Sequence, residues 1–460
     1  MRLFTLLLAF SLAAPVGAQT SRVYIANQGN FSEGDGSITV VPGGGGEGAT
    51  QLLDGALGSI LQSATLIGSE LYLVANSANR ITVVDAETDQ IVGQIGGGAE
   101  SPFSSPRYLA DLGDGTAYVT NQVYGGGSSY VLPVDLDART VGEPIEVAGL
   151  PETMAVTFDR SVYVALGTFG PGAGGVDSLA VLDLEAEPVA VGYLDIGCYA
   201  RFVMTSQGGD VLAFCTDTDE MVVVAPDADE VRQRLAFGED IGDPSDVGQT
   251  VGVGSIAIAV RRAAPPPASS FLVITSSGLA EVAEGRDGWR IERRIPIPDA
   301  ATQPISAVAL PLGAGGIVLG RPDPSAPFSA DGTVTVHDYD DGSLLATYPA
   351  GVYPAHVAVQ ERVPTASAPG AGRGGLTLAL AGPNPVRGRT ALAVTLDRPA
   401  RATVTLYDVL GRPVARLADG PHAEGTHRIE VDAGALPAGL YLARLVAEGG
   451  AAEVAVTVAR

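Results

Sequence analysis

Short runs of alternating apolar and polar residues fill the chain, and one such run returns at a nearly constant interval. It reads "VYIANQGN" at first and then "LYLVANSAN", "AYVTNQVYG" and "VYVALGTFG". The tyrosines of these runs are 48, 46 and 45 residues apart: Tyr24, Tyr72, Tyr118 and Tyr163. Weaker copies begin at Val211, Phe271 and Gly316, which makes seven copies in total. Alternation with a period of two predicts β-strands, and related copies at a fixed interval predict a repeat architecture.

Two further features recur around these copies and divide each repeat into short strands. A proline before a copy can begin a strand without removing a ladder donor, and an aspartate after a copy can close a turn with its own side chain. The prolines are Pro106, Pro151, Pro304 and Pro354, and the aspartates are Asp85, Asp135, Asp183 and Asp338. Four short strands in each repeat of about 45–50 residues are typical of a propeller blade. We therefore expect an all-β chain with a seven-bladed β-propeller in residues 19–362.

The two ends of this repeat array complement each other. The first copy, at Val23, has no strand before it, and the last strand, "VYPAHVAVQ", has no repeat after it. We expect these two segments to complete one blade and close the ring, because closure removes the open edge of the array.

The amino-acid sequences of the repeats also resemble those of a known family. "YIANQGN", "YLVANSAN" and above all "YVTNQ" at Tyr118 to Gln122 resemble the YVTN-type seven-bladed propellers of bacterial secreted and cell-surface proteins. The resemblance covers Val23 to Arg362 and is weaker in the last three blades, where the tyrosine and asparagine are replaced. It implies a scaffold for binding, although a fold does not define a function.

The composition changes after the propeller region. Residues 363–375 are rich in proline, glycine and alanine and predict a linker, and residues 376–460 contain six or seven short strands that predict a small Ig-like β-sandwich. The turns of this region resemble the type A C-terminal sorting domain of the type IX secretion system, which implies the secretion machinery as a partner. The residues that carry this resemblance are Pro383, Asn384, Pro385, Gly411, Arg412, Gly439 and Tyr441.

The first 18 residues predict a secretory signal peptide. Arg2 supplies a positive start, Leu3 to Leu12 an apolar stretch, and Val16-Gly17-Ala18 a cleavage site of small residues. This apolar stretch is too short to span a bilayer, no other stretch is long enough, and we expect no transmembrane helix. Together with the sorting domain, the leader predicts Sec export followed by type IX secretion to the outer-membrane surface or the extracellular space.

Export changes the interpretation of the two cysteines. Cys198 and Cys215 flank a predicted hairpin whose turn is centred at Ser206-Gln207, so they are equidistant from the turn and should face each other. An oxidising compartment then favours a disulfide, and the alternative is two separate buried thiols.

Charge and motifs exclude several classes of function. The chain has 27 basic and 52 acidic residues, a net charge of −25, so we expect no nucleic-acid partner. It contains no HExxH, no GxSxG, no Cys/His zinc spacing and no phosphate-binding loop. Acidic runs such as "DTDE" lack the spacing of a calcium loop. We therefore expect no metal, no cofactor and no enzymatic activity.

Two sets of residues are candidates for ligand binding. Loops that join the second strand to the third, or the fourth to the next blade, should emerge on one face of the ring, and exposed aromatic residues there suit planar rings, sugars or protein partners. These aromatic residues are Phe31, Phe103, Tyr124, Phe169, Tyr199, Phe328 and Tyr353. Polar residues at the starts of the innermost strands should line the channel mouth: Gln62, Arg107, Glu152, Arg201, Ser306 and His356. The structural alternatives are that the aromatic rings pack under their own loops and that the polar groups bond to one another.

Three functions are compatible with these features. The first is a secreted or surface propeller that captures a small ligand, a glycan or a surface protein. The second is an adhesion or surface-layer protein, and the third is a hydrolase or lyase with a site at the channel mouth. Cobalamin is a candidate ligand, because this chain is similar in fold and location to a surface propeller that passes cobalamin to an outer-membrane transporter. No residue motif supports that candidate.

Overall fold

The structure is a computed structural model of the whole chain, in which most of the strand-forming sequence is described. None of the described residues lies in a helix. They form two compact units, one spanning Ser21–Glu361 and the other including Arg362–Arg460. The description covers residues 22–42, 49–53, 56–124, 128–157, 160–167, 175–206, 209–241, 270–285, 287–309, 316–360, 370–371, 376–381, 386, 388–396, 398–408, 413–434, 436, 439–447 and 450–458.

The first unit contains seven antiparallel sheets, which are the blades. Blades 1 to 3 have the strand orders β28-β1-β2-β3, β4-β5-β6-β7 and β8-β9-β10-β11, and β12 also pairs with β10. Their strands are β28 (Pro354–Gln360), β1 (Arg22–Asn27), β2 (Ser37–Pro42), β3 (Thr50–Leu52), β4 (Leu61–Ile67), β5 (Glu70–Ala75), β6 (Arg80–Asp85), β7 (Gln90–Gly96), β8 (Pro106–Asp111), β9 (Thr116–Asn121), β10 (Ser129–Asp135), β11 (Thr140–Val141) and β12 (Ile145–Val147).

Blades 4 to 7 follow in chain order. They consist of β13 to β16, β17 to β20, β21 to β23, and β24 to β27, and three strands of blade 6 lie within the described residues. The strands are β13 (Met154–Val156), β14 (Ser161–Ala165), β15 (Ser178–Asp183), β16 (Ala190–Asp195), β17 (Ala200–Thr205), β18 (Val211–Cys215), β19 (Glu220–Ala225), β20 (Glu230–Ala236), β21 (Ser270–Thr275), β22 (Gly278–Gly285), β23 (Gly288–Pro296), β24 (Ala307–Ala309), β25 (Gly316–Arg321), β26 (Asp331–Asp338) and β27 (Leu344–Val352).

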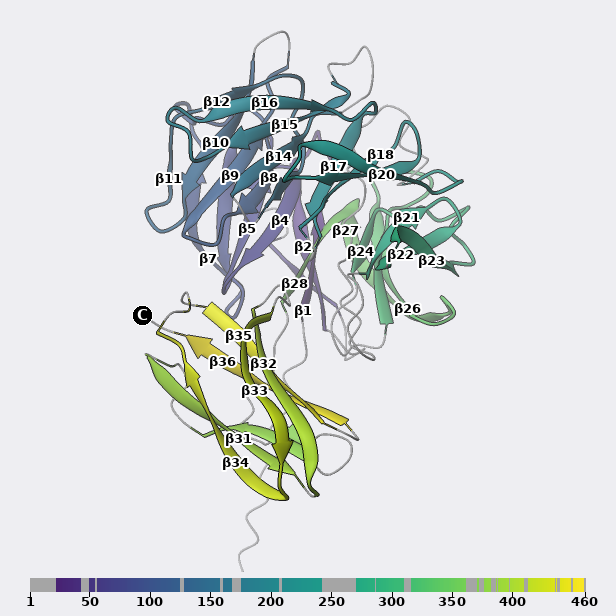
Figure 1. The fold of residues 1–460 in the computed structure, drawn as a ribbon. Coiled ribbons are helices and arrows are strands. Elements are labelled where there is room, and N and C mark those ends of the chain that lie inside the picture. Colours follow the sequence, from purple (N-terminus) through teal and green to yellow (C-terminus); the bar gives the residue numbers. More distant parts are fainter. Residues whose placement is uncertain are drawn as a thin grey trace, which may run out of the picture. The chain divides into compact units, whose positions relative to one another are not determined.

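The ring closes as the sequence predicts. Strand β28 pairs antiparallel with β1, and Tyr24 lies opposite Ala358 in that ladder. Figure 1 shows the green β28 beside the purple β1, although 326 residues separate the end of one from the start of the other (354 − 27 − 1). Seven apolar clusters, one for each pair of neighbouring blades, fill the spaces between the sheets and include the pair formed by blades 7 and 1. The fold is therefore a seven-bladed β-propeller.

The repeated tyrosine has a packing role. Tyr24, Tyr72 and Tyr163 are almost fully buried, each in the apolar cluster that its blade shares with the next blade. The residues before and after this tyrosine on the strand point to the preceding blade, so the second strand of a blade is apolar on both faces. Outer strands such as β20 instead alternate between exposed and partly buried positions. Burying one large apolar side chain contributes about 1.5–3 kcal/mol, so this position stabilises the packing between blades.

The predicted turns form as expected. The Asp85 carboxylate accepts the backbone N–H of Thr88 at 2.7 Å, and that of Asp135 accepts the N–H of Ala138 at 2.7 Å. Pro354 begins β28, but Pro151 lies three residues before β13 rather than inside it.

The C-terminal unit is a β-sandwich with its own core. Its two sheets have the orders β29-β30-β31-β34 and β33-β32-β35-β36, and one apolar cluster lies between them. The strands are β29 (Gly370–Ala371), β30 (Leu376–Leu380), β31 (Arg389–Leu396), β32 (Ala400–Asp408), β33 (Pro413–His422), β34 (Gly425–Asp432), β35 (Gly439–Ala447) and β36 (Gly450–Val458). Gly439 begins β35, and Tyr441 is buried in the core. The other five sorting-motif residues, Pro383, Asn384, Pro385, Gly411 and Arg412, lie outside the described residues.

Candidate functional site

Strand order places the predicted aromatic loops on one face of the ring. Successive strands of a blade run in opposite directions, so the loop after the second strand and the loop after the fourth emerge on the same side. We call this side the rim face. It carries Phe31, Phe103, Tyr124, Tyr199, Phe328 and Tyr353, and Phe169 lies outside the described residues.

Burial separates these aromatic residues into two groups. Phe31 and Tyr124 are 49% and 54% exposed, whereas Phe103 and Tyr353 are 3% and 1% exposed. Phe103 belongs to the apolar cluster between blades 2 and 3, and Tyr353 stacks on Phe328 with ring centroids 4.7 Å apart. Phe103 and Tyr353 therefore pack under their loops, as the structural alternative predicts, and offer no exposed ring.

Arg107 is the centre of a buried polar cluster that joins three blades. From β8 its Nε donates to Glu152 Oε2 at 3.1 Å and its Nη2 donates to Glu152 Oε1 at 2.8 Å. Its Nη1 donates to Gln62 Oε1 of blade 2 at 2.5 Å. All three side chains are at most 3% exposed. The two parallel bonds make a bidentate guanidinium–carboxylate pair, the strongest common form of ion pair.

Tyr108 and His356 extend this cluster to blade 1. The Tyr108 hydroxyl lies 3.5 Å from His356 Nε2, and the two rings meet edge to face. Burial, reinforced by the positive charge of Arg107, lowers the pKa of His356 from 6.5 to about 3, so the imidazole is neutral at physiological pH. Burial also raises the pKa of Tyr108 above its usual value, and Arg201 of blade 5 is close enough to act on it electrostatically.

Irregularities in the inner strands explain how these side chains meet. The β4–β5 ladder skips Gln62, the β17–β18 ladder skips Arg201, and the β8–β9 ladder is interrupted between Pro106 and Leu109. A bulged residue is not paired in the ladder, and the bulge re-aims its side chain. The consecutive residues Arg107 and Tyr108 can therefore both join the cluster, which strict alternation would forbid. Sequence reasoning missed Tyr108 for this reason.

Tyr124 connects the buried cluster to the rim face. Its ring is 54% exposed, while its hydroxyl donates to Gln122 Oε1. Gln122 in turn donates to the carbonyl of Pro151 at 3.1 Å, next to Glu152. The charges of Arg107 and Glu152 both act on the Tyr124 hydroxyl, whose pKa is raised mainly by burial. The hydroxyl of this exposed tyrosine is thus held within electrostatic reach of the buried ion pair.

Ser306 and the cysteines stabilise the propeller rather than join this cluster. Ser306 Oγ donates to the carbonyl of Pro354 at 2.5 Å, linking blades 7 and 1. The disulfide between Cys198 and Cys215 is confirmed, with Cα atoms 5.9 Å apart. The expected register was wrong, because the ladder pairs Thr205 with Val211 instead of being centred at Ser206-Gln207, and Ala200, not Cys198, lies opposite Cys215.

Within the described part of the chain, no group of three or more His, Cys, Asp or Glu side chains could hold a metal ion. The same residues include no helix with the length and hydropathy of a membrane span.

Fold and site together define an all-β protein in which a closed propeller with a polar axial cluster precedes a β-sandwich. Residues 382–457 match the family of secretion system C-terminal sorting domains. The protein therefore carries a type IX sorting domain that engages the secretion machinery and directs export to the cell surface or the extracellular space.

Solved structures resemble the chain in fold. A functionally unknown protein from Desulfotomaculum acetoxidans aligns with a TM-score of 0.52 and 9% identity, over 74% of this chain and 99% of that one. A protein from Lactobacillus plantarum aligns with a TM-score of 0.50 and 14% identity, over 74% of this chain and all of that one (100%). No curated protein matches the sequence. At these identities the likeness concerns the fold alone, and the resemblance to YVTN-type repeats is not confirmed.

Proposed function

We propose that this exported propeller is a binding protein that captures a small ligand on its rim face, over the Arg107 cluster. The observation that carries the proposal is the placement of Tyr124, an exposed residue whose hydroxyl bonds to Gln122 within electrostatic reach of a buried guanidinium–carboxylate pair. An exposed aromatic face supplies apolar contact, and the polar groups beneath it supply orientation, which is the usual composition of a ligand site.

The energetics of the cluster support a role beyond stability. Taking Arg107 and Glu152 out of water costs several kcal/mol per ion, and similar apolar residues would often stabilise a core equally well. Perturbed titration of Tyr108 and His356 in the same place is a further mark of a functional site. A ligand with a planar or flat ring and one polar edge fits this arrangement.

The proposed activity is binding without a chemical step. Glu152 accepts two hydrogen bonds from one guanidinium, so its carboxylate is poorly placed to act as a base. His356 is neutral, but it is buried among Tyr108 and Arg107 rather than exposed to the rim. These constraints favour the binding hypothesis over a hydrolase or lyase.

Native mass spectrometry of the full chain tests the proposal, with cobalamin, riboflavin, adenosine and haem as probes. We expect one of these ring compounds to form a one-to-one complex that Tyr124→Ala abolishes. Tyr193→Ala, which removes an equally exposed tyrosine from β16, is the matched control and should leave that complex intact. If none of the probes binds, or if Tyr124→Ala binds as well as the wild type, the rim face is not a site for such ligands.

A further inference from the structure

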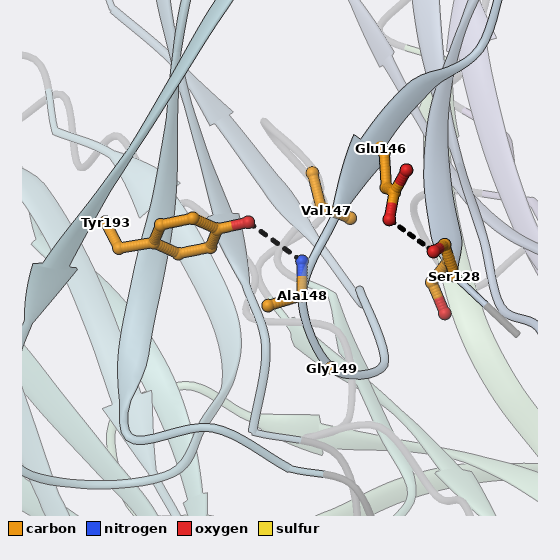
Figure 2. A pocket seen from close by; sticks show the side chains of 7 residues that line it. Ser128, Glu146, Val147, Ala148, Gly149 and Tyr193 are labelled. Carbon is orange, nitrogen blue, oxygen red and sulfur yellow. Dashed lines mark hydrogen bonds between the residues drawn. The ribbon is translucent and has the colours of Figure 1, made fainter. Parts of the chain in front are cut away.

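A pocket lies at the outer strands of blades 3 and 4, where the loops after β9 and β12 emerge. It has a volume of about 330 Å³, near the lower end for small-molecule sites. Figure 2 shows Tyr193 of β16 on one side and Glu146 of β12 on the other. Its lining also includes Ser128, Val147, Ala148 and Gly149.

The outer strand of blade 3 is broken into two pieces, and the second piece, β12, borders this pocket. β11 pairs with Val134 and Asp135 of β10, whereas β12 pairs with Ser129 to Val131, so the outer strand is interrupted in between. Pro133 lies at the interruption and has no N–H to donate to a continuous ladder. Beyond β12 the chain turns toward blade 4 through Ala148 and Gly149, which leaves a hollow beside β16.

Tyr193 bridges the two blades across this hollow. Its hydroxyl accepts the backbone N–H of Ala148 at 2.9 Å, and its side chain is nevertheless 51% exposed (Figure 2). On β16 it shares a face with Val191, which packs against the apolar cluster between blades 3 and 4. The Tyr193 side chain is therefore fixed by β16 at its Cα and by Ala148 at its hydroxyl, and part of its surface faces the pocket and solvent.

Polar groups of defined chemistry line the same pocket. The Ser128 hydroxyl donates to Glu146 Oε1, which leaves the carboxylate further lone pairs for other donors. A half-exposed aromatic ring, a carboxylate and a hydroxyl are complementary to a sugar, whose C–H face packs on the ring while its hydroxyls bond to the oxygens. The Glu146 carboxylate and the net charge of −25 both oppose an anionic ligand.

We infer that the pocket between β12 and β16 is a second binding site, which holds one neutral sugar unit of a glycan. Tyr193 is the stacking platform, and Glu146 and Ser128 are the hydrogen-bond partners. This site shares no residue with the Arg107 cluster or with Tyr124, and Glu146 and Tyr193 belong to the outer strands of their blades rather than to the inner ones.

Affinity electrophoresis of the full chain tests this inference in gels that contain amylose, galactomannan, xyloglucan or mixed-linkage β-glucan. We expect at least one of these neutral polysaccharides to retard the protein. Tyr193→Ala should weaken that binding about tenfold, which matches the loss of one aromatic contact. Glu146→Gln should also weaken it, and Tyr193→Phe, which keeps the ring, should retain most of it.

Two controls show whether a loss of binding comes from this pocket, from the ligand site at Tyr124 or from misfolding of the variant. Tyr124→Ala should bind the polysaccharide as the wild type does, and the melting temperature of each variant reports its folding. Glu146 is exposed, so Glu146→Gln should fold. It therefore tests whether the pocket binds glycan if Tyr193→Ala does not fold. The inference is overturned if no neutral polysaccharide retards the protein, if both pocket variants bind normally, or if choline displaces the glycan and so reveals a cation site.

Discussion

Tyr108 and His356 meet inside the ring with their ring centroids 5.3 Å apart and their planes at 77°, although they are 248 positions apart in the chain. One lies on the innermost strand of blade 3 and the other on the strand that closes blade 1. The contact therefore exists only when the ring is closed. It places a neutral imidazole against a neutral phenol in a cluster whose charges are carried by Arg107, Glu152 and Arg201.

The first prediction concerns acid stability. The pKa of His356 is about 3 in the folded protein, whereas an unfolded histidine titrates near 6.5. Between these values the unfolded chain binds a proton that the folded chain does not, so the free energy of unfolding falls as the pH drops from about 6.5 toward about 3. The contribution of this histidine has a maximal slope of about 1.4 kcal/mol per pH unit, and above about pH 7 it vanishes.

Urea unfolding between pH 4 and pH 8 measures this effect. His356→Gln should flatten the pH dependence, while His337, whose pKa is also lowered by burial, should account for part of the remaining slope. His427→Gln in the sandwich is the control for removing a histidine elsewhere. An unchanged slope in His356→Gln would show that the imidazole is not held neutral by its surroundings.

The second prediction concerns the buried ion pair. Glu152→Gln leaves the Arg107 charge without its partner, which should cost about 3–5 kcal/mol in the free energy of unfolding. The double variant Arg107→Met with Glu152→Leu should be much less destabilised, because it removes both charges. Arg160→Met, which breaks the exposed pair with Asp114, should cost only about 0–1 kcal/mol.

Denaturant titration at pH 7 distinguishes these outcomes. A Glu152→Gln variant as stable as Arg160→Met would contradict the view that the Arg107–Glu152 pair is desolvated. The double variant also separates stability from binding, since the proposed rim-face ligand should no longer bind to it even where it folds.

The third prediction concerns the disulfide. Cys198 and Cys215 are 17 positions apart and both buried, and a closed loop of this size stabilises a fold by about 3 kcal/mol in the chain-entropy model. The double variant Cys198→Ala with Cys215→Ala should lose about that amount in urea unfolding. Adding a reductant should destabilise the wild type and leave the double variant unchanged, and equal sensitivity of both would refute the assignment.

The fourth prediction concerns ring closure. A chain that ends at Glu361 retains the whole propeller unit and should unfold cooperatively without the sandwich. A chain that ends at Tyr353 lacks β28, so β1 loses a strand partner and Ser306 loses the shorter of its hydrogen bonds, to the carbonyl of Pro354. We expect the shorter chain to be at least about 3 kcal/mol less stable, since several partly or fully buried apolar residues are removed with β28.

Thermal melting followed by circular dichroism compares the two truncations. The longer one serves as the control for loss of the C-terminal unit. Equal melting temperatures would mean that the contact of β28 with β1 contributes little to the ring.

The sequence by itself determined the number of sheets, the closing strand, the aspartate turns, the sandwich and the pairing of Cys198 with Cys215. Alternation, turn chemistry and the count of repeats predict these features, and the two cysteines of an exported chain predict their own pairing although their expected register was wrong. Only the tertiary structure decided that Tyr108 joins Arg107, that Phe103 and Tyr353 are buried, and that Tyr193 borders a pocket. Those outcomes depend on irregular ladders and on contacts between blades, where a side chain's surroundings come from segments tens to hundreds of residues away.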